Sequence, residues 1–339
     1  MVPQTPEQLF TPFDEATGLL QGALRSSRMD AFLENAENLV DGGKVRIEDG
    51  VPDQATADQV SALYAKIDLA SADPETIRKF LQLALLKVMR QDQFQANHQM
   101  TPDTLGLLMA ALVERLARHQ TPQSVLDLAV GVGNLLYTVM NRLKQDLGQP
   151  LQGFGIDNDE TMLAAASVSA ELQKQPVTLL HQDAIQALDV PLVDLVVSDL
   201  PVGYYPLDAN TTNYRTRAQE GHSYVHHLMI EQATNYLAPG GFGLFLVPSS
   251  LFKTKETKGL VEWIQSVAYL QGLVNLPSEL FASPQAAKSI LLLQRHGADS
   301  HQAAKVLLGT FPSFKDQVGF KKFMAEVDQW MATNLTHES

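Results

Sequence analysis

The sequence predicts an α/β fold: a doubly wound, mostly parallel sheet preceded by an all-helical N-terminal domain. Two observations support this prediction. Residues 1 to about 95 repeat apolar side chains at helical spacing without a strand pattern, whereas the rest of the chain alternates short apolar runs with amphipathic stretches. The length of 339 residues and the hydrophobic content of 45% fit two folded domains. We expect a helical domain at 1–95 and an α/β domain at 96–339.

The N-terminal domain is expected to consist of helices joined by short turns. Apolar residues recur at three- and four-residue steps from Leu9 to Leu24, which is typical of a helix. Turn-forming residues at 41–43 and 71–74 separate the later segments, and the second turn also has the composition of a helix start. The glutamine-rich stretch 90–99 lacks apolar spacing and predicts a hinge. The further helices are expected at 30–39, 56–67 and 74–88.

The C-terminal part shows the pattern of a sheet with connecting helices. Strands that are buried on both faces read as continuous apolar runs, which is typical of parallel sheets. Such runs occur at 125–128, 153–156, 177–180, 192–197, 242–247, 273–276 and 290–293. The segments 134–147, 159–172, 222–237 and 257–269 are long enough for crossover helices. One more amphipathic helix is predicted at 314–331.

Composition and charge exclude several classes of protein. The absence of cysteine excludes disulfide scaffolds, cysteine-ligated zinc, iron–sulfur clusters and thiol nucleophiles. The net charge of −13 disfavours tight nonspecific binding to nucleic acid, which depends on lysine and arginine. No apolar stretch is long enough to span a bilayer, and no leader pattern follows Met1. We therefore expect a cytoplasmic location and no membrane partner.

The residues directly after the predicted strands indicate where a ligand binds, because ligands of such sheets lie beyond the carboxyl ends of the strands. The first strand leads through Asp127 into a turn with Gly131 and Gly133, where the backbone can approach a ligand closely. The third glycine of a dinucleotide fingerprint would fall at Leu136, which argues against a dinucleotide. A purely structural turn is the alternative.

Acidic residues also follow the next two predicted strands. Asp157, followed by Asn158, can accept the hydroxyl hydrogens of a ribose, and Asp183 stands before Ala184 in the equivalent place. Capping of the next helix is the alternative role for each aspartate. Together with the glycines of the first turn, these carboxylates predict a nucleoside held along the strand ends.

The segment after the fourth predicted strand carries a family resemblance. It reads Ser198-Asp199-Leu200-Pro201-Val202-Gly203-Tyr204-Tyr205. This segment resembles the Asn/Asp-Pro-Pro-Tyr/Phe motif of those class I S-adenosylmethionine-dependent methyltransferases that methylate amino groups, among them the N6-adenine DNA methylases. Asp199 matches the Asn/Asp position, Leu200 and Pro201 match the two prolines, and Val202 matches the aromatic residue.

The resemblance extends upstream, to residues 97–102. There, Thr101-Pro102 is similar to a segment that precedes the cofactor domain in the modification subunits of type I restriction systems, which also begin with a helical domain. The cofactor motif precedes the catalytic motif, which is the order of the gamma group of these methylases. The resemblance covers about residues 95–295 and implies a seven-stranded methyltransferase sheet.

The resemblance also implies residue roles. The cofactor would be S-adenosylmethionine, and the acceptor an exocyclic amine, with adenine N6 in DNA as the expected target. Asp199 and the Leu200 carbonyl would accept the amine hydrogens, within a catalytic segment that includes Pro201, and Tyr204 would stack on the base. The implied cofactor-binding residues are Thr101, Asp127, Ala129, Gly131, Gly133, Asn134, Asp157, Asn158, Asp183 and Ala184.

Two departures from the family pattern leave alternatives open. Val202 occupies the aromatic position, and Tyr204 and Tyr205 come two and three positions later. The chain also leaves little room for a target-recognition domain, so DNA binding is expected to be weak without a protein partner or a second copy. The alternatives are an RNA base or a protein glutamine amide as the acceptor, and a noncatalytic protein that binds S-adenosylmethionine.

Two further groups of residues complete the candidates. His222 and His226 have the i, i+4 spacing of metal ligands, but no third ligand stands at a suitable spacing, so we expect no metal and a partly solvated helix face that includes His227. Five basic residues form the candidate binding patch for an anionic substrate. The alternative is that they are separate surface charges without a binding role. The patch comprises Arg215, Arg217, Lys253, Lys255 and Lys258.

Overall fold

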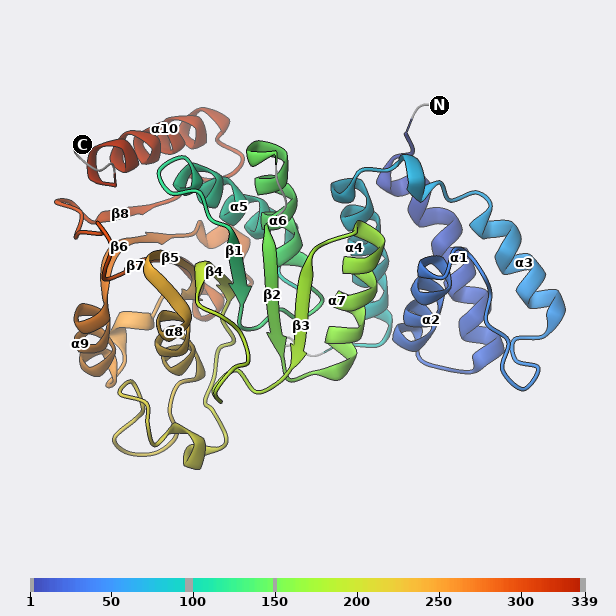
Figure 1. Cartoon of the computed structure of the whole chain (residues 1–339), viewed down its shortest axis with the longest axis horizontal. Coiled ribbons are helices and arrows are strands. Elements are labelled where there is room, and N and C mark those ends of the chain that lie inside the picture. Colours follow the sequence, from blue (N-terminus) through green and yellow to red (C-terminus); the bar gives the residue numbers. More distant parts are fainter. Residues whose placement is uncertain (1–2, 95–99, 149–150, 336–339) are drawn as a thin grey trace.

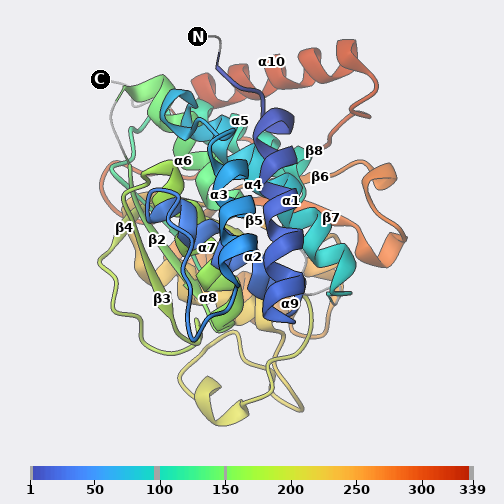
Figure 2. The same cartoon turned by 90° about the vertical axis from the view of Figure 1, so that its right-hand side faces the viewer.

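The N-terminal domain is helical, as the apolar spacing predicted. It contains α1 (Pro6–Leu24), α2 (Arg28–Val40), α3 (Gln54–Tyr64) and α4 (Pro74–Gln91). α1 packs against the other three helices (Figure 2). Asp73 caps α4 by accepting the Thr76 N–H at 3.0 Å, as expected from the turn before it. The computed structural model describes residues 3–94, 100–148 and 151–335, so the boundary predicted near residue 95 lies outside the described residues.

The apolar core of the helical domain contains a group of phenylalanines and extends beyond that domain. Phe13 meets Phe32 and Phe80 edge-on, with ring centroids 5.6 and 5.5 Å apart. The same apolar cluster includes Met162 and Val168 of α7 (Glu160–Gln173), a helix of the α/β part. Figure 1 shows the helical domain lying against α7. The two parts of the chain therefore share one core.

The α/β part contains one eight-stranded sheet with the order β3-β2-β1-β4-β5-β7-β6-β8. Strands β1 to β5 are parallel, β7 runs antiparallel to both of its neighbours, and β8 is parallel to β6. The strand order reverses between β1 and β4, which is where ligands bind in such sheets. The strands are β1 (Ser124–Asp127), β2 (Gln152–Asp157), β3 (Val177–His181), β4 (Val193–Asp199), β5 (Leu237–Pro248), β6 (Ala268–Asn275), β7 (Lys288–Arg295) and β8 (Leu307–Thr310).

These strands confirm the predicted fold class and add one edge strand to the seven that were expected. β8 has only four residues, and half-buried and exposed side chains alternate along it; Leu308 is 69% exposed. A strand covered on one face lacks the continuous apolar run that marks the other strands. That is why the sequence pattern did not reveal it.

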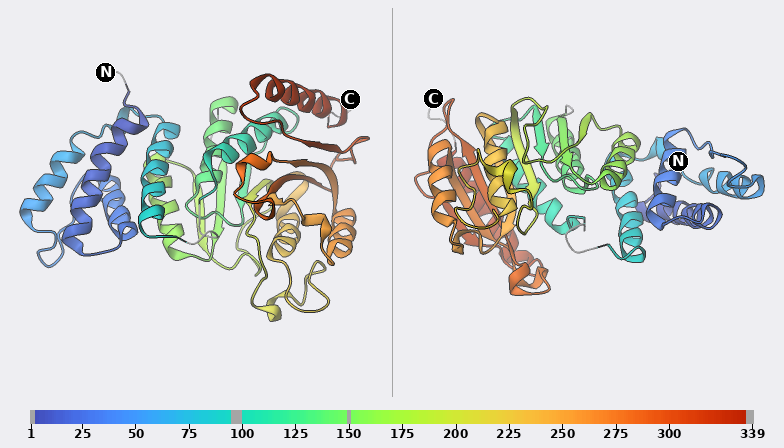
Figure 3. Two further views of the ribbon diagram at one scale, coloured as in Figure 1. Left: turned by 180° about the vertical axis from the view of Figure 1, so that it is seen from behind. Right: turned by 90° about the horizontal axis from the view of Figure 1, so that it is seen from below.

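Helices cover both faces of the sheet (Figure 3). One face packs against α5 (Asp103–Ala117), α6 (Asn134–Leu147) and α10 (Gln317–Asn334), the last of which confirms the predicted C-terminal helix. The other face packs against α8 (Val225–Tyr236) and α9 (Thr257–Val267). Within the described residues, no helix combines the length and apolar character that crossing a membrane requires.

The expectation for the histidines was wrong. His226 and His227 lie in the first turn of α8 and are buried, 2% and 0% exposed, because this end of the helix packs beneath Tyr224. Burial lowers the pKa of His226 to about 3 and that of His227 to about 4, so both imidazoles are neutral at physiological pH. His222 precedes the helix, is exposed, and contacts Asp208 at 2.8 Å.

Candidate functional site

The turn after β1 is shaped by its two glycines. Gly131 has φ of 52° and Gly133 has φ of 83°, and Gly133 stands directly before the first residue of α6. A Cβ atom at Gly133 would come within 2.2 Å of the Tyr137 ring, so packing requires glycine there. A Cβ at Gly131 would meet nothing within 4 Å. The backbone at Gly131 therefore faces open space, which fits the close approach of a ligand.

Asp127 is a buried carboxylate with one free oxygen. It is 1% exposed, and its Oδ1 accepts hydrogen bonds from Ser198 Oγ at 2.6 Å and from the Ala129 N–H at 3.1 Å. Its Oδ2 has no hydrogen-bond partner among the described residues. Burial, with smaller contributions from the charges of Asp199 and Asp157, raises the pKa of this carboxyl to about 7. An unpartnered buried oxygen fits a site that a ligand donor completes.

Asp157 holds the glycine turn in place. Its Oδ2 accepts the Gly131 N–H at 2.8 Å and its Oδ1 accepts the Asp159 N–H at 3.0 Å. The cap of α7 is Asp159, which accepts the Met162 N–H at 3.0 Å, so Asp157 is not used as a helix cap. The neighbouring Asn158 is exposed, and its carbonyl contacts a ring nitrogen of His181. Burial raises the pKa of Asp157.

Asp183 is tied to the loop after β4. Its Oδ1 accepts the Ile185 N–H at 3.0 Å, and its Oδ2 accepts a hydrogen bond from the Tyr205 hydroxyl. Asn210 donates to the same hydroxyl at 3.0 Å. Burial raises the pKa of Tyr205 to about 12. Tyr205 is therefore a buried anchor of this loop, whereas Ala184 is half-buried in the apolar cluster beneath it.

Asp199 lies at the end of β4 between two side chains from distant parts of the chain. Its Oδ2 accepts a hydrogen bond from Thr101 Oγ1 at 3.0 Å, and its Oδ1 forms an ion pair with Lys288 Nζ. The next residue, Leu200, is fully buried, and its N–H donates to the Leu246 carbonyl at 3.1 Å. A proline has no N–H for this bond, which gives the leucine at the first proline position a structural use. Pro201 follows, half-buried.

Two tyrosines, the exposed Tyr204 and the half-buried Tyr224, form a stacked pair beside this motif. The rings of Tyr204 and Tyr224 have centroids 4.8 Å apart at an interplanar angle of 23°, and their hydroxyls are 3.3 Å apart. An isolated β-bridge joins the two residues, which closes the loop between them. Tyr204 is 61% exposed, and Val202, at the aromatic position of the motif, is also exposed. The aromatic surface is therefore displaced by two residues from the position that the motif predicts.

Asn134 links the glycine turn to the segment before α5. Its Nδ2 donates to the Thr101 carbonyl at 2.8 Å, and its Oδ1 accepts a hydrogen bond from Arg78 of the helical domain at 2.6 Å. Thr101 thus contacts both Asn134 and Asp199. The predicted residues of the two motifs meet at one edge of the sheet.

The sequence interpretation missed Lys288, Tyr224, Ser198 and Arg78. Ser198 stands beside Asp199 in the motif, and a polar residue within an apolar strand was the signal that could have identified it. The predicted basic residues are all exposed: Lys253 at the end of η4 (Leu251–Lys253), Lys255 between η4 and α9, Lys258 in α9, and Arg215 and Arg217 in the loop before α8. A Cβ at Gly259 would lie 3.8 Å from the Arg215 carbonyl, so the two halves of this patch are neighbours.

Comparison with known proteins identifies relatives over nearly the whole chain. A model of the N-6 DNA methylase family matches residues 85–324, and a model of the YtxK N-terminal helical domain matches residues 7–89. The Bacillus subtilis (strain 168) protein YtxK is 35% identical over 317 residues, 94% of each chain.

Solved structures give the same result for the fold. A Listeria monocytogenes protein, described as a candidate class I S-adenosylmethionine-dependent methyltransferase, is 38% identical, has a TM-score of 0.87, and is matched over 96% of this chain and 98% of its own. The methyltransferase subunit of a type I restriction-modification system from Streptococcus thermophilus has a TM-score of 0.64 at 12% identity, over 94% of this chain and 74% of its own. At that identity the second likeness shows the fold alone.

Proposed function

Because this chain belongs to the N-6 DNA methylase family, we propose that it binds S-adenosylmethionine and transfers the methyl group to an exocyclic amine, with adenine N6 in DNA as the acceptor. The observation that carries the proposal is the position of Asp199. Its carboxylate lies at the carboxyl edge of the sheet, next to Ser198, which contacts Asp127 of the glycine turn. An acceptor at Asp199 and a cofactor at the turn would therefore be neighbours.

The residues of the turn fit such a cofactor. The open backbone at Gly131 and the unpartnered Oδ2 of Asp127 offer a close approach and a hydrogen-bond acceptor. Asp157 keeps lone pairs for ribose hydroxyls, because a carboxylate has about four acceptor sites and two are in use. We assign the cofactor to these residues together with Thr101, Ala129, Gly133, Asn134, Asn158, Asp183 and Ala184. When bound, it supplies an electrophilic methyl group on a sulfonium centre.

Asp199 is held ready to orient an amine. Thr101 and Lys288 each use one of its oxygens, which fixes the carboxylate and leaves acceptor sites for an amine hydrogen. The ammonium of Lys288 also offsets the charge of Asp199, so the pair presents a nearly neutral acceptor. Orientation of a poor nucleophile is the contribution that the protein must make when the methyl donor is already reactive.

The Tyr204–Tyr224 pair would hold the acceptor ring. Stacking on an aromatic side chain contributes about 1–3 kcal/mol per base, and the exposed Tyr204 is available for it. A base within a duplex must first be flipped out of the stack. We therefore place the acceptor between this pair and Asp199, with Leu200 and Pro201 forming the backbone beneath it.

Contacts with DNA are expected to be few. The net charge of −13 leaves the exposed basic patch of Lys253, Lys255 and Lys258, with Arg215 and Arg217, as the main phosphate-binding surface. We propose weak and salt-sensitive binding by the protein alone, strengthened by a protein partner or by homodimerisation. A cytoplasmic location belongs to the same proposal.

A second candidate function follows from the ion pair between Lys288 and Asp199. An amine must share this carboxylate with Lys288, and Val202 supplies no aromatic ring at the motif position. Both observations favour a protein that binds S-adenosylmethionine without turnover. An RNA base or a glutamine amide as the acceptor remains the alternative within the enzyme class.

The test is transfer of labelled methyl from S-adenosylmethionine to DNA, RNA and protein fractions. We expect label in DNA and a loss of about 100-fold or more in Asp199→Ala, by analogy with other transition-state hydrogen bonds. Asp208→Ala is the matched control, because Asp208 is an exposed aspartate in the loop after β4 and contacts His222 rather than the motif. Label in another fraction would reassign the acceptor. Binding of S-adenosylhomocysteine without label in any fraction would favour the second candidate.

A further inference from the structure

We infer that Arg78 of the helical domain is a positioning residue for the cofactor turn and for Asp199. The helical domain would then form part of the site instead of being only an attached module. This inference rests on the proposed function, because it concerns the same site. It is carried by a continuous series of hydrogen bonds that begins in α4 and ends at the motif aspartate.

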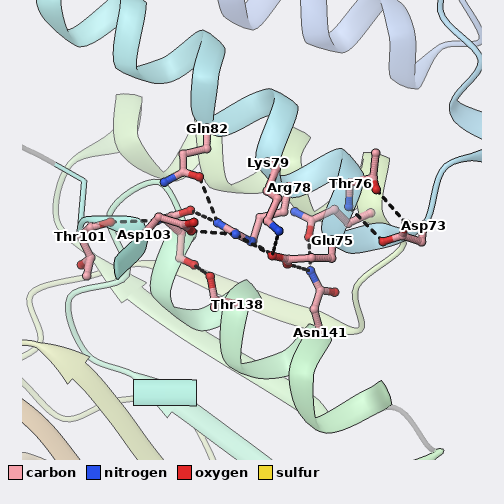
Figure 4. Close-up of polar contacts among 12 residues, drawn as sticks. Asp73, Glu75, Thr76, Arg78, Lys79, Gln82, Thr101, Asp103, Thr138 and Asn141 are labelled. Carbon is pink, nitrogen blue, oxygen red and sulfur yellow. Dashed lines mark hydrogen bonds and ion pairs between the residues drawn. The ribbon is translucent and has the colours of Figure 1, made fainter. Parts of the chain in front are cut away.

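Arg78 is buried where α4 meets α5 and α6 (Figure 4). Its Nε and Nη2 donate to the two carboxylate oxygens of Glu75 at 2.8 and 2.7 Å, and Nη2 also donates to Asp103 Oδ1 at 2.8 Å. Its Nη1 donates to Asn134 Oδ1 at 2.6 Å. The side chain is 2% exposed, and a buried guanidinium needs such partners to offset the loss of hydration. The two carboxylates balance the guanidinium charge, and Nη1 donates to Gln82 Oε1 at 3.5 Å in addition to Asn134.

The bond from Arg78 fixes which way the Asn134 amide points. A guanidinium can only donate, so the atom that faces it must be the amide oxygen. The amide nitrogen then faces the other way, where it donates to the Thr101 carbonyl at 2.8 Å. Thr101 in turn donates through Oγ1 to Asp199 Oδ2 at 3.0 Å. The series therefore runs from Arg78 through Asn134 and Thr101 to Asp199.

The position of Asn134 gives the series its link to the cofactor turn. Asn134 is the first residue of α6 and directly follows Gly133. Loss of the Arg78 bond would leave the amide free to rotate, which would loosen both the end of the glycine turn and the Thr101 segment. If Arg78 only held the two domains together, its loss would leave the glycine turn and the Thr101 segment unchanged.

Arg28 provides a matched control. It is a second buried arginine of the helical domain, 6% exposed, and its side chain contacts Asp14 and Gln21 of α1. These contacts lie inside the helical domain. Arg28→Met should therefore lower the stability of the protein, as Arg78→Met does, without changing the turn.

The first experiment measures binding of S-adenosylhomocysteine to the full chain by calorimetry, below the unfolding temperature of every variant. We expect Arg78→Met to raise the Kd about tenfold or more, and Arg28→Met to leave it within about twofold. Asn134→Ala should raise the Kd as well, and adding Arg78→Met to it should have little further effect, because Arg78 acts through Asn134. Additive losses in the double variant would overturn the inference.

The second experiment needs no ligand. Hydrogen exchange of the amides of residues 129–134 should be faster in Arg78→Met than in wild type, and unchanged in Arg28→Met. Arg78→Lys, which keeps the charge beside Glu75 and Asp103, is the variant to use if Arg78→Met does not fold. Equal exchange in the Arg78 and Arg28 variants would overturn the inference even if wild type binds the cofactor. Failure of wild type to bind would overturn the proposed function, and the exchange data would then decide the inference separately.

Discussion

Lys288 forms an ion pair with Asp199 although β5 separates their two strands in the sheet. β7 is antiparallel to β5, so its first residue, Lys288, lies at the edge where the parallel strands end; it is paired there with Pro248. The side chains of Lys288 and Asp199 are 22% and 16% exposed. The pair is therefore shielded from water, and removing one member leaves a charge with poor hydration.

Because the Lys288–Asp199 ion pair is shielded from water, Lys288→Met should destabilise the folded protein. The variant leaves the Asp199 carboxylate without its cation, and we expect the free energy of unfolding to fall by about 1–3 kcal/mol. Adding Asp199→Asn removes the unpaired charge and should restore part of the loss. Urea unfolding of the single and double variants measures both effects. Equal stability of Lys288→Met and wild type would show that the ion pair is unimportant for the fold.

Asp127 predicts a pH dependence of stability. The pKa of its carboxyl rises from 3.8 to about 7 on folding, so between these pH values the folded protein holds a proton that the unfolded chain has released. Its contribution to stability is full below about pH 4 and is lost as the pH rises through about 7. Asp127→Asn cannot ionise, so the stability of wild type relative to this variant should fall across that range. Parallel stability curves for the two proteins would contradict the prediction.

Tyr204 should affect the acceptor and leave the cofactor alone. Tyr204→Ala removes one ring of the stacked pair, and we expect KM for the acceptor to rise about tenfold or more, while the Kd of S-adenosylhomocysteine stays the same. Tyr204→Phe keeps the ring and loses the hydroxyl contact with Tyr224, so it should stay close to wild type. Steady-state kinetics and calorimetry on the three proteins provide the test. An unchanged KM in Tyr204→Ala would remove the stacking role.

The two glycines of the turn should respond differently to alanine. Gly133→Ala places a methyl group against the Tyr137 ring and should strongly destabilise the protein. The methyl group of Gly131→Ala would lie in open space, so it causes no clash. The loss of stability should then be about 1–2 kcal/mol, the cost of a positive φ for a residue with a Cβ atom. The main effect of Gly131→Ala should be weaker binding of S-adenosylhomocysteine. Thermal unfolding and calorimetry separate the two outcomes, and unchanged affinity in Gly131→Ala would place the cofactor elsewhere.

The sequence predicted most of the fold because buried strands and crossover helices leave strong periodic patterns. It also predicted that the candidate site residues would gather at one edge of the sheet, since Asp127, Asp157, Asp183 and Asp199 each lie at or just after the end of a parallel strand. It missed Lys288 for a physical reason. The residues after parallel strands lie at this edge, whereas an antiparallel strand brings its first residue there.

Tyr224 and Arg78 could not be predicted by the same reasoning. Tyr224 reaches Tyr204, 20 positions earlier in the sequence, only because the loop between them closes through an isolated β-bridge, and loop closure leaves no periodic signal. Arg78 belongs to another domain, so only tertiary packing brings it to Asn134. His226 and His227 were expected on a partly solvated helix face because no third metal ligand stands near them, whereas both are buried beside the Tyr224 ring.

The core shared by the helical domain and α7 limits how this chain can be recombined. Leu81, Leu85 and Val88 of α4 belong to the same apolar cluster as Met162 and Val168 of α7. A graft of the α/β part onto a different N-terminal domain would expose that face of α7 to water. The α/β part of this protein therefore cannot be combined freely with other N-terminal domains. A chimera that folds would have to keep the α4 surface that packs against α7 together with the sheet.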